Sequence, residues 1–159
     1  MKLYYLVMNY LEEALSYISE AANLALHSNC LRSRCGSVIV SDKIIIGSGW
    51  NSPPQHRVLK YCFKDDLPKD FKSDRTCCVH AEQRAIMDAL RKNPDRIVGS
   101  RLYFIRLDDK GNKLFAGDPY CTICSKMALD VGIKEFVLFH ENGICVYDTF
   151  EYNEISFCR

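Results

Sequence analysis

Two short segments of the chain concentrate the side-chain types that bind transition metals. They read Cys-Val-His-Ala-Glu at 78–82 and Pro-Tyr-Cys-Thr-Ile-Cys at 119–124. Cys121 and Cys124 are three positions apart, which on a helix puts their β-carbons about 5–6 Å apart on one face. The partial positive charge at a helix N-terminus favours thiolates. Two thiolates and the imidazole of His80 would together supply three good ligands for zinc.

The number of ligands indicates what such an ion would do. Three protein ligands leave the fourth tetrahedral position to water, which is typical of a catalytic zinc site. Zinc lowers the pKa of its water to about 7 and so provides hydroxide at neutral pH. Glu82 follows His80 by two residues and can move protons in the same cleft without binding the ion. We therefore expect metal-assisted hydrolysis, with His80, Cys121 and Cys124 as metal ligands and Glu82 as the catalytic acid–base.

A Cys-x-x-Cys pair has other common uses. It occurs as a redox pair and as half of a structural zinc ribbon. The other half of a ribbon would need a second spaced pair, but Cys77 and Cys78 are adjacent. The alternative to a catalytic protein is a non-catalytic zinc- or nucleotide-binding module. The carboxylate of Glu82 counts against this alternative, because a structural zinc site has no use for such a group.

The composition excludes several classes of protein. The chain has 159 residues, 48% of them hydrophobic, which fits one domain over residues 1–159 with a real core. A net charge of +1 argues against binding to long nucleic acid. No apolar run approaches the roughly 20 residues of a membrane span, and the N-terminal segment does not read as a signal peptide. The nine cysteines are an odd number, and with no secretion signal they favour the reducing cytoplasm.

Hydrophobic periodicity predicts the elements that hold these segments. Helices are expected from Tyr10 to His27, Ala81 to Lys92 and Thr122 to Asp130. Strands are expected at Ser37–Val40, Ile44–Trp50, Leu102–Ile105, Lys113–Phe115, Glu135–Phe139 and Ile144–Tyr147. Residues 51–78 are polar and irregular. The order predicts an α/β fold: a single-domain, three-layer α/β/α structure with a mixed five-stranded sheet.

The two metal-binding segments also carry a resemblance. His-x-Glu followed by Cys-x-x-Cys is the known mark of zinc deaminases, and the chain resembles the cytidine/deoxycytidylate deaminase superfamily, most closely its deoxycytidylate branch. Residues 33–40, 49–54, 78–83 and 128–137 are similar to that branch. The resemblance implies one catalytic zinc, a small nucleotide or nucleoside substrate, and a homo-oligomer with pockets at subunit contacts. It also implies that Asn51 holds the sugar and that the backbone around Ala81 reads the exocyclic amine.

The chain departs from that branch at three places. Tyr120 separates the usual Pro from Cys121, Arg84 stands where Asn is usual, and the stretch from His80 to Cys121 is longer, mostly between Arg106 and Asp118. Tyr120 and Arg84 are therefore candidate substrate contacts. The expected reaction converts a dCMP-like nucleotide to its uracil form. Another nucleoside, a purine or an RNA base stays open as the substrate.

A second group of cysteines is a weaker candidate for a metal site. Some deoxycytidylate deaminases hold a structural zinc at comparable positions, and the resemblance makes Cys30, Cys62, Cys77 and Cys78 the candidate ligands here. We do not expect a full second site to form.

Overall fold

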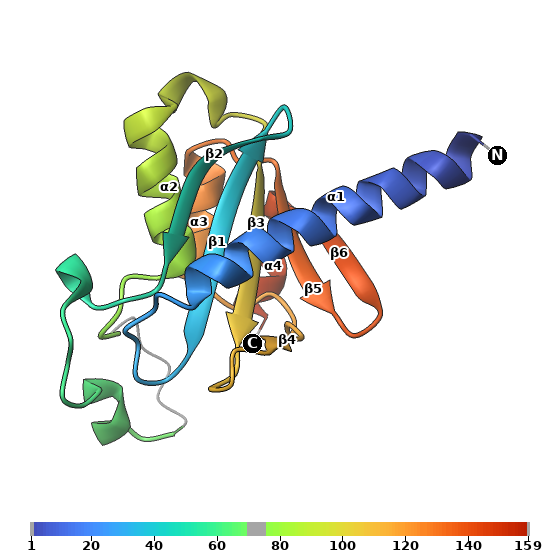
Figure 1. Cartoon of the computed structure of the whole chain (residues 1–159). Coiled ribbons are helices and arrows are strands. Elements are labelled where there is room, and N and C mark those ends of the chain that lie inside the picture. Colours follow the sequence, from blue (N-terminus) through green and yellow to red (C-terminus); the bar gives the residue numbers. More distant parts are fainter. Residues whose placement is uncertain (1, 70–75, 159) are drawn as a thin grey trace.

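A six-stranded sheet forms the centre of the computed structural model, which describes residues 2–69 and 76–158 (Figure 1). The strands lie in the order β2-β1-β3-β5-β6, and β4 pairs with β3. The strands are β1 (Arg34–Ser41), β2 (Ile44–Trp50), β3 (Arg101–Leu107), β4 (Lys113–Leu114), β5 (Glu135–His140) and β6 (Gly143–Asp148). The helices are α1 (Lys2–Ala25), α2 (Ala81–Lys92), α3 (Thr122–Asp130) and α4 (Thr149–Phe157), with short 3-10 helices at Pro54–His56, Phe63–Asp66 and Pro94–Arg96.

The sheet is mixed and has helices on both faces. The pair β3 and β5 is parallel, and every other pairing in the sheet is antiparallel. Helix α1 crosses one face, whereas α2, α3 and α4 lie on the other (Figure 1). This confirms the expected three-layer α/β/α fold. The sheet has six strands where five were expected, because the short strand expected at residues 113–115 pairs with the end of β3 as β4.

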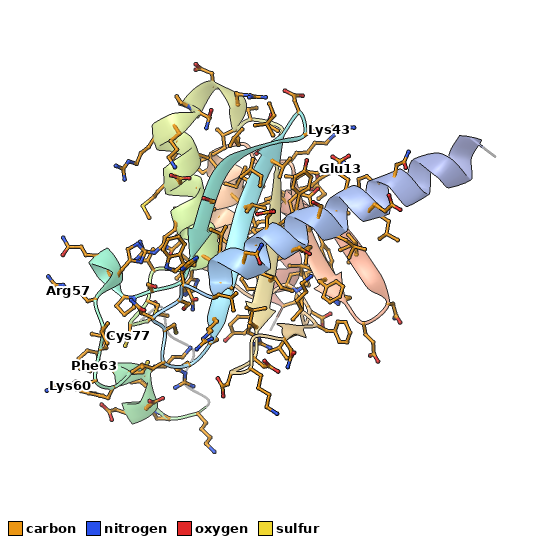
Figure 2. The ribbon with its side chains drawn as sticks, in the orientation of Figure 1. Glu13, Lys43, Arg57, Lys60, Phe63 and Cys77 are labelled. Carbon is orange, nitrogen blue, oxygen red and sulfur yellow. The ribbon has the colours of Figure 1, made fainter. Side chains whose placement is uncertain are left out.

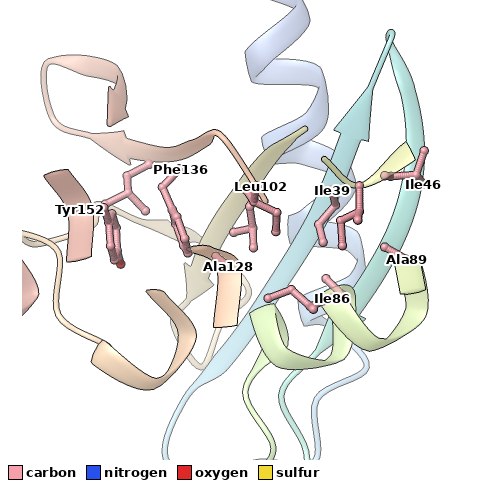
Figure 3. Packing of buried hydrophobic residues seen from close by; sticks show 12 residues of the cluster. Ile39, Ile46, Ile86, Ala89, Leu102, Ala128, Phe136 and Tyr152 are labelled. Carbon is pink, nitrogen blue, oxygen red and sulfur yellow. The ribbon is translucent and has the colours of Figure 1, made fainter. Parts of the chain in front are cut away.

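The core on the α2 and α3 face fixes the two helices that carry the metal-binding segments. Ile39 and Leu102 from the sheet meet Ile86 of α2, and Phe136 of β5 meets Ala128 of α3 (Figure 3). All five side chains are fully buried. Burial of such aliphatic and aromatic side chains stabilises the fold by about 1.5–3 kcal/mol each. The helix starts therefore sit on a rigid support.

Close approach of α1 to the sheet depends on Gly36. A β-carbon at this position of β1 would lie 1.8 Å from the carbonyl oxygen of Ala21. A similar clash occurs on the other face, where a β-carbon at Gly49 would lie 2.5 Å from that of Arg84. Both helices therefore pack at distances that only glycine permits.

We expect Gly36→Ala to lower the free energy of unfolding by about 3 kcal/mol, the upper part of the usual range for overpacking, because the clash is with backbone. Urea unfolding followed by circular dichroism measures this change. The matched control is Gly117→Ala, since an added β-carbon there meets nothing within 4 Å. Equal stability of the two variants would contradict the close packing of α1.

The C-terminal helix α4 was not predicted. Its start is capped by Asp148, whose carboxylate accepts the backbone N–H of Phe150 at 2.9 Å. Its apolar residues do not form one stripe, because Phe150 and Phe157 are exposed while Tyr152 is buried. A search for a single apolar face therefore misses it. Within the described ranges, none of the helices has the length and apolar character needed to cross a membrane.

Candidate active site

Two helix N-termini bring the predicted metal ligands together. His80 immediately precedes α2, and Cys121 immediately precedes α3. The Nδ1 atom of His80 lies 3.3 Å from the Sγ atom of Cys121 and 3.3 Å from that of Cys124. The ligand atoms of the three residues all lie within 4.8 Å of one another. The structure thus assembles the trio that the two sequence segments predicted.

The donor set fits zinc. An imidazole and two thiols at these separations match the bond lengths of about 2.0–2.1 Å to nitrogen and 2.3 Å to sulfur that zinc adopts. The hydrogen bond with Cys124 lowers the pKa of the Cys121 thiol to about 4 despite its burial. The same bond, and then burial, raises the pKa of Cys124 well above its usual range. One sulfur is therefore a thiolate without a metal, and the other would release its proton to solvent if zinc bound.

Glu82 is buried beside this trio. It occupies the first turn of α2, and its side chain is 6% exposed. Burial raises the pKa of the Glu82 carboxyl to about 7, although the neighbouring His80 lowers it. A carboxyl whose pKa lies near neutrality can both accept and donate a proton at physiological pH, as acid–base catalysis requires.

A cavity of about 530 Å³ opens onto this centre. Glu82, Asn51, Ala81 and Tyr120 all line it, as do His80 and Cys121. Tyr120 is 64% exposed at the surface of the cavity, whereas Ala81 is fully buried in its wall. Four residues that the sequence singled out, Asn51, Ala81, Glu82 and Tyr120, therefore line one cavity with the metal-binding side chains.

The amide of Asn51 is largely engaged with the protein. Its Oδ1 atom accepts hydrogen bonds from the backbone N–H of Cys35 and the hydroxyl of Ser28, both at 2.7 Å. Its Nδ2 atom donates to the carbonyl oxygen of Ser33 at 2.9 Å. Asn51 therefore fixes the segment before β1, and one N–H of its amide stays available to a ligand.

Arg84 lies away from the cavity that was expected to contain it. It lines a second cavity, together with Trp50 and His56. Its Nη2 atom donates to the carbonyl oxygens of Ser52 at 3.2 Å and Pro53 at 3.1 Å. The placement therefore gives Arg84 a structural role: it ties the turn after Asn51 to the helix that carries Glu82. A substrate contact by Arg84 has no support in this geometry.

We expect Arg84→Gln to lower the free energy of unfolding of the zinc-loaded protein by about 1–2 kcal/mol, because two carbonyl groups lose their cationic donor. Denaturant titration checks this value. The control is Arg91→Gln, at an exposed residue that lines the same second cavity. That change should cost no more than about 0.5 kcal/mol. An effect of the same size in both variants would contradict the proposed tie.

The four cysteines of the weaker cluster all line the main cavity but form two pairs. The Sγ atoms of Cys62 and Cys77 are 3.4 Å apart, and Cys30 hydrogen-bonds to Cys78. Cys77 also accepts the backbone N–H of Phe63, near which it lies in Figure 2. Within residues 2–69 and 76–158, only the His80 group places three metal-binding side chains within 4.8 Å of one another. Whether these four cysteines hold a second ion stays a question for metal analysis.

Sequence reasoning missed several residues of the cavity. Arg106 lines it from β3, opposite Cys35 of β1, and Lys64 lines it from the segment after Cys62. Tyr152 lines it from α4. Arg106 could have been found from strand register, since it follows the predicted strand directly. Nothing in the local sequence marks Lys64 or Tyr152.

Comparisons with known proteins agree with this geometry. Residues 11–140 match the family described as "Cytidine and deoxycytidylate deaminase zinc-binding region". The deoxycytidylate deaminase of Saccharomyces cerevisiae is 33% identical over 128 residues, which cover 77% of this chain and 36% of that protein. The deoxycytidylate deaminase of Mycobacterium phage D29 is 29% identical over 129 residues, 76% of this chain and 89% of that one. The chain thus spans about a third of the yeast relative's length.

Solved structures share the fold. The dCMP deaminase of cyanophage S-TIM5 superposes with a TM-score of 0.53 at 25% identity, covering 79% of this chain and 80% of that one. A cytidine deaminase from Burkholderia pseudomallei superposes with a TM-score of 0.57 at 14% identity, covering 86% of this chain and 93% of that one. With the zinc-ligand trio in place and most of its length matched, the chain belongs to the cytidine and deoxycytidylate deaminase family.

Proposed function

We propose that the chain catalyses the zinc-dependent hydrolytic deamination of a cytosine nucleotide, dCMP or a close relative. The products are the uracil form and ammonia. One observation carries the proposal: the buried Glu82, with its pKa raised to about 7, shares a cavity with His80, Cys121 and Cys124. A structural zinc site has no need of a buried carboxyl that is not one of its ligands, because burying such a group costs free energy.

The residues divide the chemistry between them. His80, Cys121 and Cys124 would hold zinc, which when bound lowers the pKa of a water and supplies the nucleophile. Glu82 accepts a proton from the attacking water and delivers it to the ring nitrogen. It then takes the proton of the new C4 hydroxyl and passes it to the amine, so that the C4–N bond breaks, the C4 carbonyl forms and ammonia departs as a neutral molecule. We assign recognition of the exocyclic amine to the backbone at Ala81, which lines the cavity.

The charge of the cavity favours a nucleotide over a nucleoside. Arg106 and Lys64 line it, and a phosphate group would complement both. Arg32 also lines it, although an ion pair with Asp65 engages it. The cyanophage relative, 26% identical, has been solved with dCMP and dUMP bound. The volume of about 530 Å³ is ample for one nucleotide.

The setting of the enzyme is part of the proposal. We place it in the cytoplasm, since all nine cysteines are free thiols, as expected in a reducing compartment. We treat residues 1–159 as one deaminase domain, because a single sheet runs from β2 to β6. The expected homo-oligomer, in which a neighbouring subunit borders the pocket, stays a prediction that size measurements in solution can check.

The test is ammonia release by the zinc-loaded protein from dCMP, CMP, deoxycytidine, cytidine, dAMP and dGMP. We expect dCMP to react fastest, with deoxycytidine slower by at least about ten-fold because it lacks the charged group that Arg106 and Lys64 would bind. Faster turnover of a purine nucleotide would move the substrate to that class. No ammonia from any of the six compounds would favour the non-catalytic module.

A further inference from the structure

The segment that follows α1 is joined by hydrogen bonds to the turn that follows β2 (Figure 1). The backbone N–H of Asn29 donates to the hydroxyl of Ser52 at 3.2 Å, and its side-chain amide donates to the carbonyl oxygen of His56 at 2.9 Å. One residue earlier, Ser28 contacts Asn51, which lines the main cavity. The end of α1 therefore reaches a residue of the cavity wall.

The hydroxyl of Ser28 donates to Asn51. Its oxygen lies 2.7 Å from Oδ1 of the Asn51 amide and 2.6 Å from the backbone carbonyl oxygen of the same residue. It also lies 3.1 Å from the backbone nitrogen of Cys30, which can only donate. Since both oxygens of Asn51 can only accept, the hydroxyl accepts from Cys30 and shares its single proton between those two oxygens.

These contacts leave the amide of Asn51 as a hydrogen-bond donor toward the cavity. Its Oδ1 atom receives two hydrogen bonds, from Ser28 and from the backbone N–H of Cys35, which fill its two lone pairs. Its Nδ2 atom carries two N–H groups, and the carbonyl oxygen of Ser33 takes one of them. Asn51 is 6% exposed and shares the cavity with Glu82. The group that it can offer to a ligand is therefore the second N–H.

We infer that Ser28 is a positioning residue for substrate binding. Ser28 is outside the cavity lining, so it acts on a substrate through Asn51. By filling the second lone pair of Oδ1, it holds the amide so that the free N–H donates to an acceptor oxygen of the substrate. The effect on substrate binding rests on the proposed function, whereas the arrangement of the hydrogen bonds rests on the geometry alone.

The kinetic test compares Ser28→Ala with Ser52→Ala. Both variants remove a hydroxyl that accepts a backbone N–H where α1 meets the turn, but the hydroxyl of Ser52 bonds to Asn29 and not to the amide of Asn51. We expect the KM for dCMP to rise about three- to ten-fold in Ser28→Ala, because a donor to the amide is lost. The value of kcat should stay within about two-fold, since the contact is made equally in the ground and transition states. Ser52→Ala should keep the KM of the unmodified protein.

A double-mutant cycle with Asn51→Ala asks whether Ser28 acts through the amide. Once the amide is removed, the hydroxyl of Ser28 has only a backbone oxygen of position 51 to bond. Ser28→Ala should therefore change the KM by less than about two-fold in the Asn51→Ala background. The full three- to ten-fold effect in that background would place the action of Ser28 elsewhere and overturn the inference. An unchanged KM in Ser28→Ala alone would overturn it as well.

Hydrogen exchange tests the contacts without a variant or a substrate. In the zinc-loaded protein the backbone amides of Cys30 and Cys35 should exchange at least about ten-fold more slowly than unprotected amides, because Ser28 and Asn51 accept their hydrogens. Rapid exchange of either amide would overturn the inference, even if a variant failed to fold. The absence of ammonia from every nucleotide would count against the proposed function, whereas the exchange result would still decide the arrangement around Asn51.

Discussion

Glu82→Gln is expected to lower kcat for dCMP deamination by about 10²–10⁴-fold, the usual contribution of a general acid–base. The amide has nearly the same shape as the carboxyl but cannot accept a proton at neutral pH. Glu82 is 6% exposed and is not one of the three grouped metal ligands, so zinc content should stay at that of the unmodified protein. Ammonia release and zinc analysis on the same sample measure the two quantities.

The pH dependence gives a separate check on Glu82. The carboxyl must be ionised to accept the proton of water, so kcat/KM should fall as the pH drops through the pKa of Glu82. That pKa is about 7 without metal, mainly because of burial. A bound zinc ion would stabilise the carboxylate and so lower this raised pKa. The acid limb of the profile should therefore lie at or below pH 7.

The control for Glu82→Gln is Gln83→Ala. Gln83 is the next residue of α2, and its side chain caps the helix by accepting the backbone N–H of His80 at 2.9 Å. Its loss should cost about 1 kcal/mol of stability and lower kcat by about ten-fold at most, because it orients His80 without taking part in proton transfer. Full activity of Glu82→Gln would remove the carboxyl from the mechanism. Loss of zinc in that variant would instead indicate that Glu82 binds the ion or supports a residue that binds it.

The sequence was sufficient to predict that His80, Cys121 and Cys124 come together, because these residues follow local rules. His80 and Cys121 each immediately precede a helix that was predicted with its observed bounds. A ligand at a helix start has its direction set by the first turn. The hairpin of β1 and β2 was found in the same way, from alternation and the turn between them. Short-range patterns thus defined the parts that hold the metal.

The surroundings of that centre depend on contacts that are distant in sequence. Arg84 was expected to face a ligand, but the carbonyl groups of Ser52 and Pro53 take its guanidinium. Tyr152 reaches the cavity only because α4 packs on Phe136 and α3. Neither placement follows from periodicity, since each is decided by tertiary packing among separate elements. The residues expected to govern substrate choice are therefore the ones that sequence patterns predict least well.

Removal of a metal ligand is expected to abolish the high-affinity zinc site. Cys124 is fully buried in the first turn of α3, and no solvent can replace its sulfur. We expect Cys124→Ala to contain one zinc ion fewer per chain. A ligand at a thousand times its Kd stabilises a protein by about 4 kcal/mol. Chelation should thus destabilise the unmodified protein by about that amount but leave Cys124→Ala unaffected.

Zinc affinity should also rise with pH, and the sign follows from the thiols. Cys121 is already ionised, since the hydrogen bond with Cys124 lowers its pKa to about 4. The pKa of Cys124 lies well above its usual range, so this thiol must release its proton when zinc binds. Each proton released makes the apparent affinity about ten-fold higher per pH unit. The matched control is Cys158→Ala, at an exposed cysteine. If Cys124→Ala held zinc as tightly as this control, the three-ligand centre would be wrong, because a buried sulfur cannot leave the coordination sphere without a measurable loss.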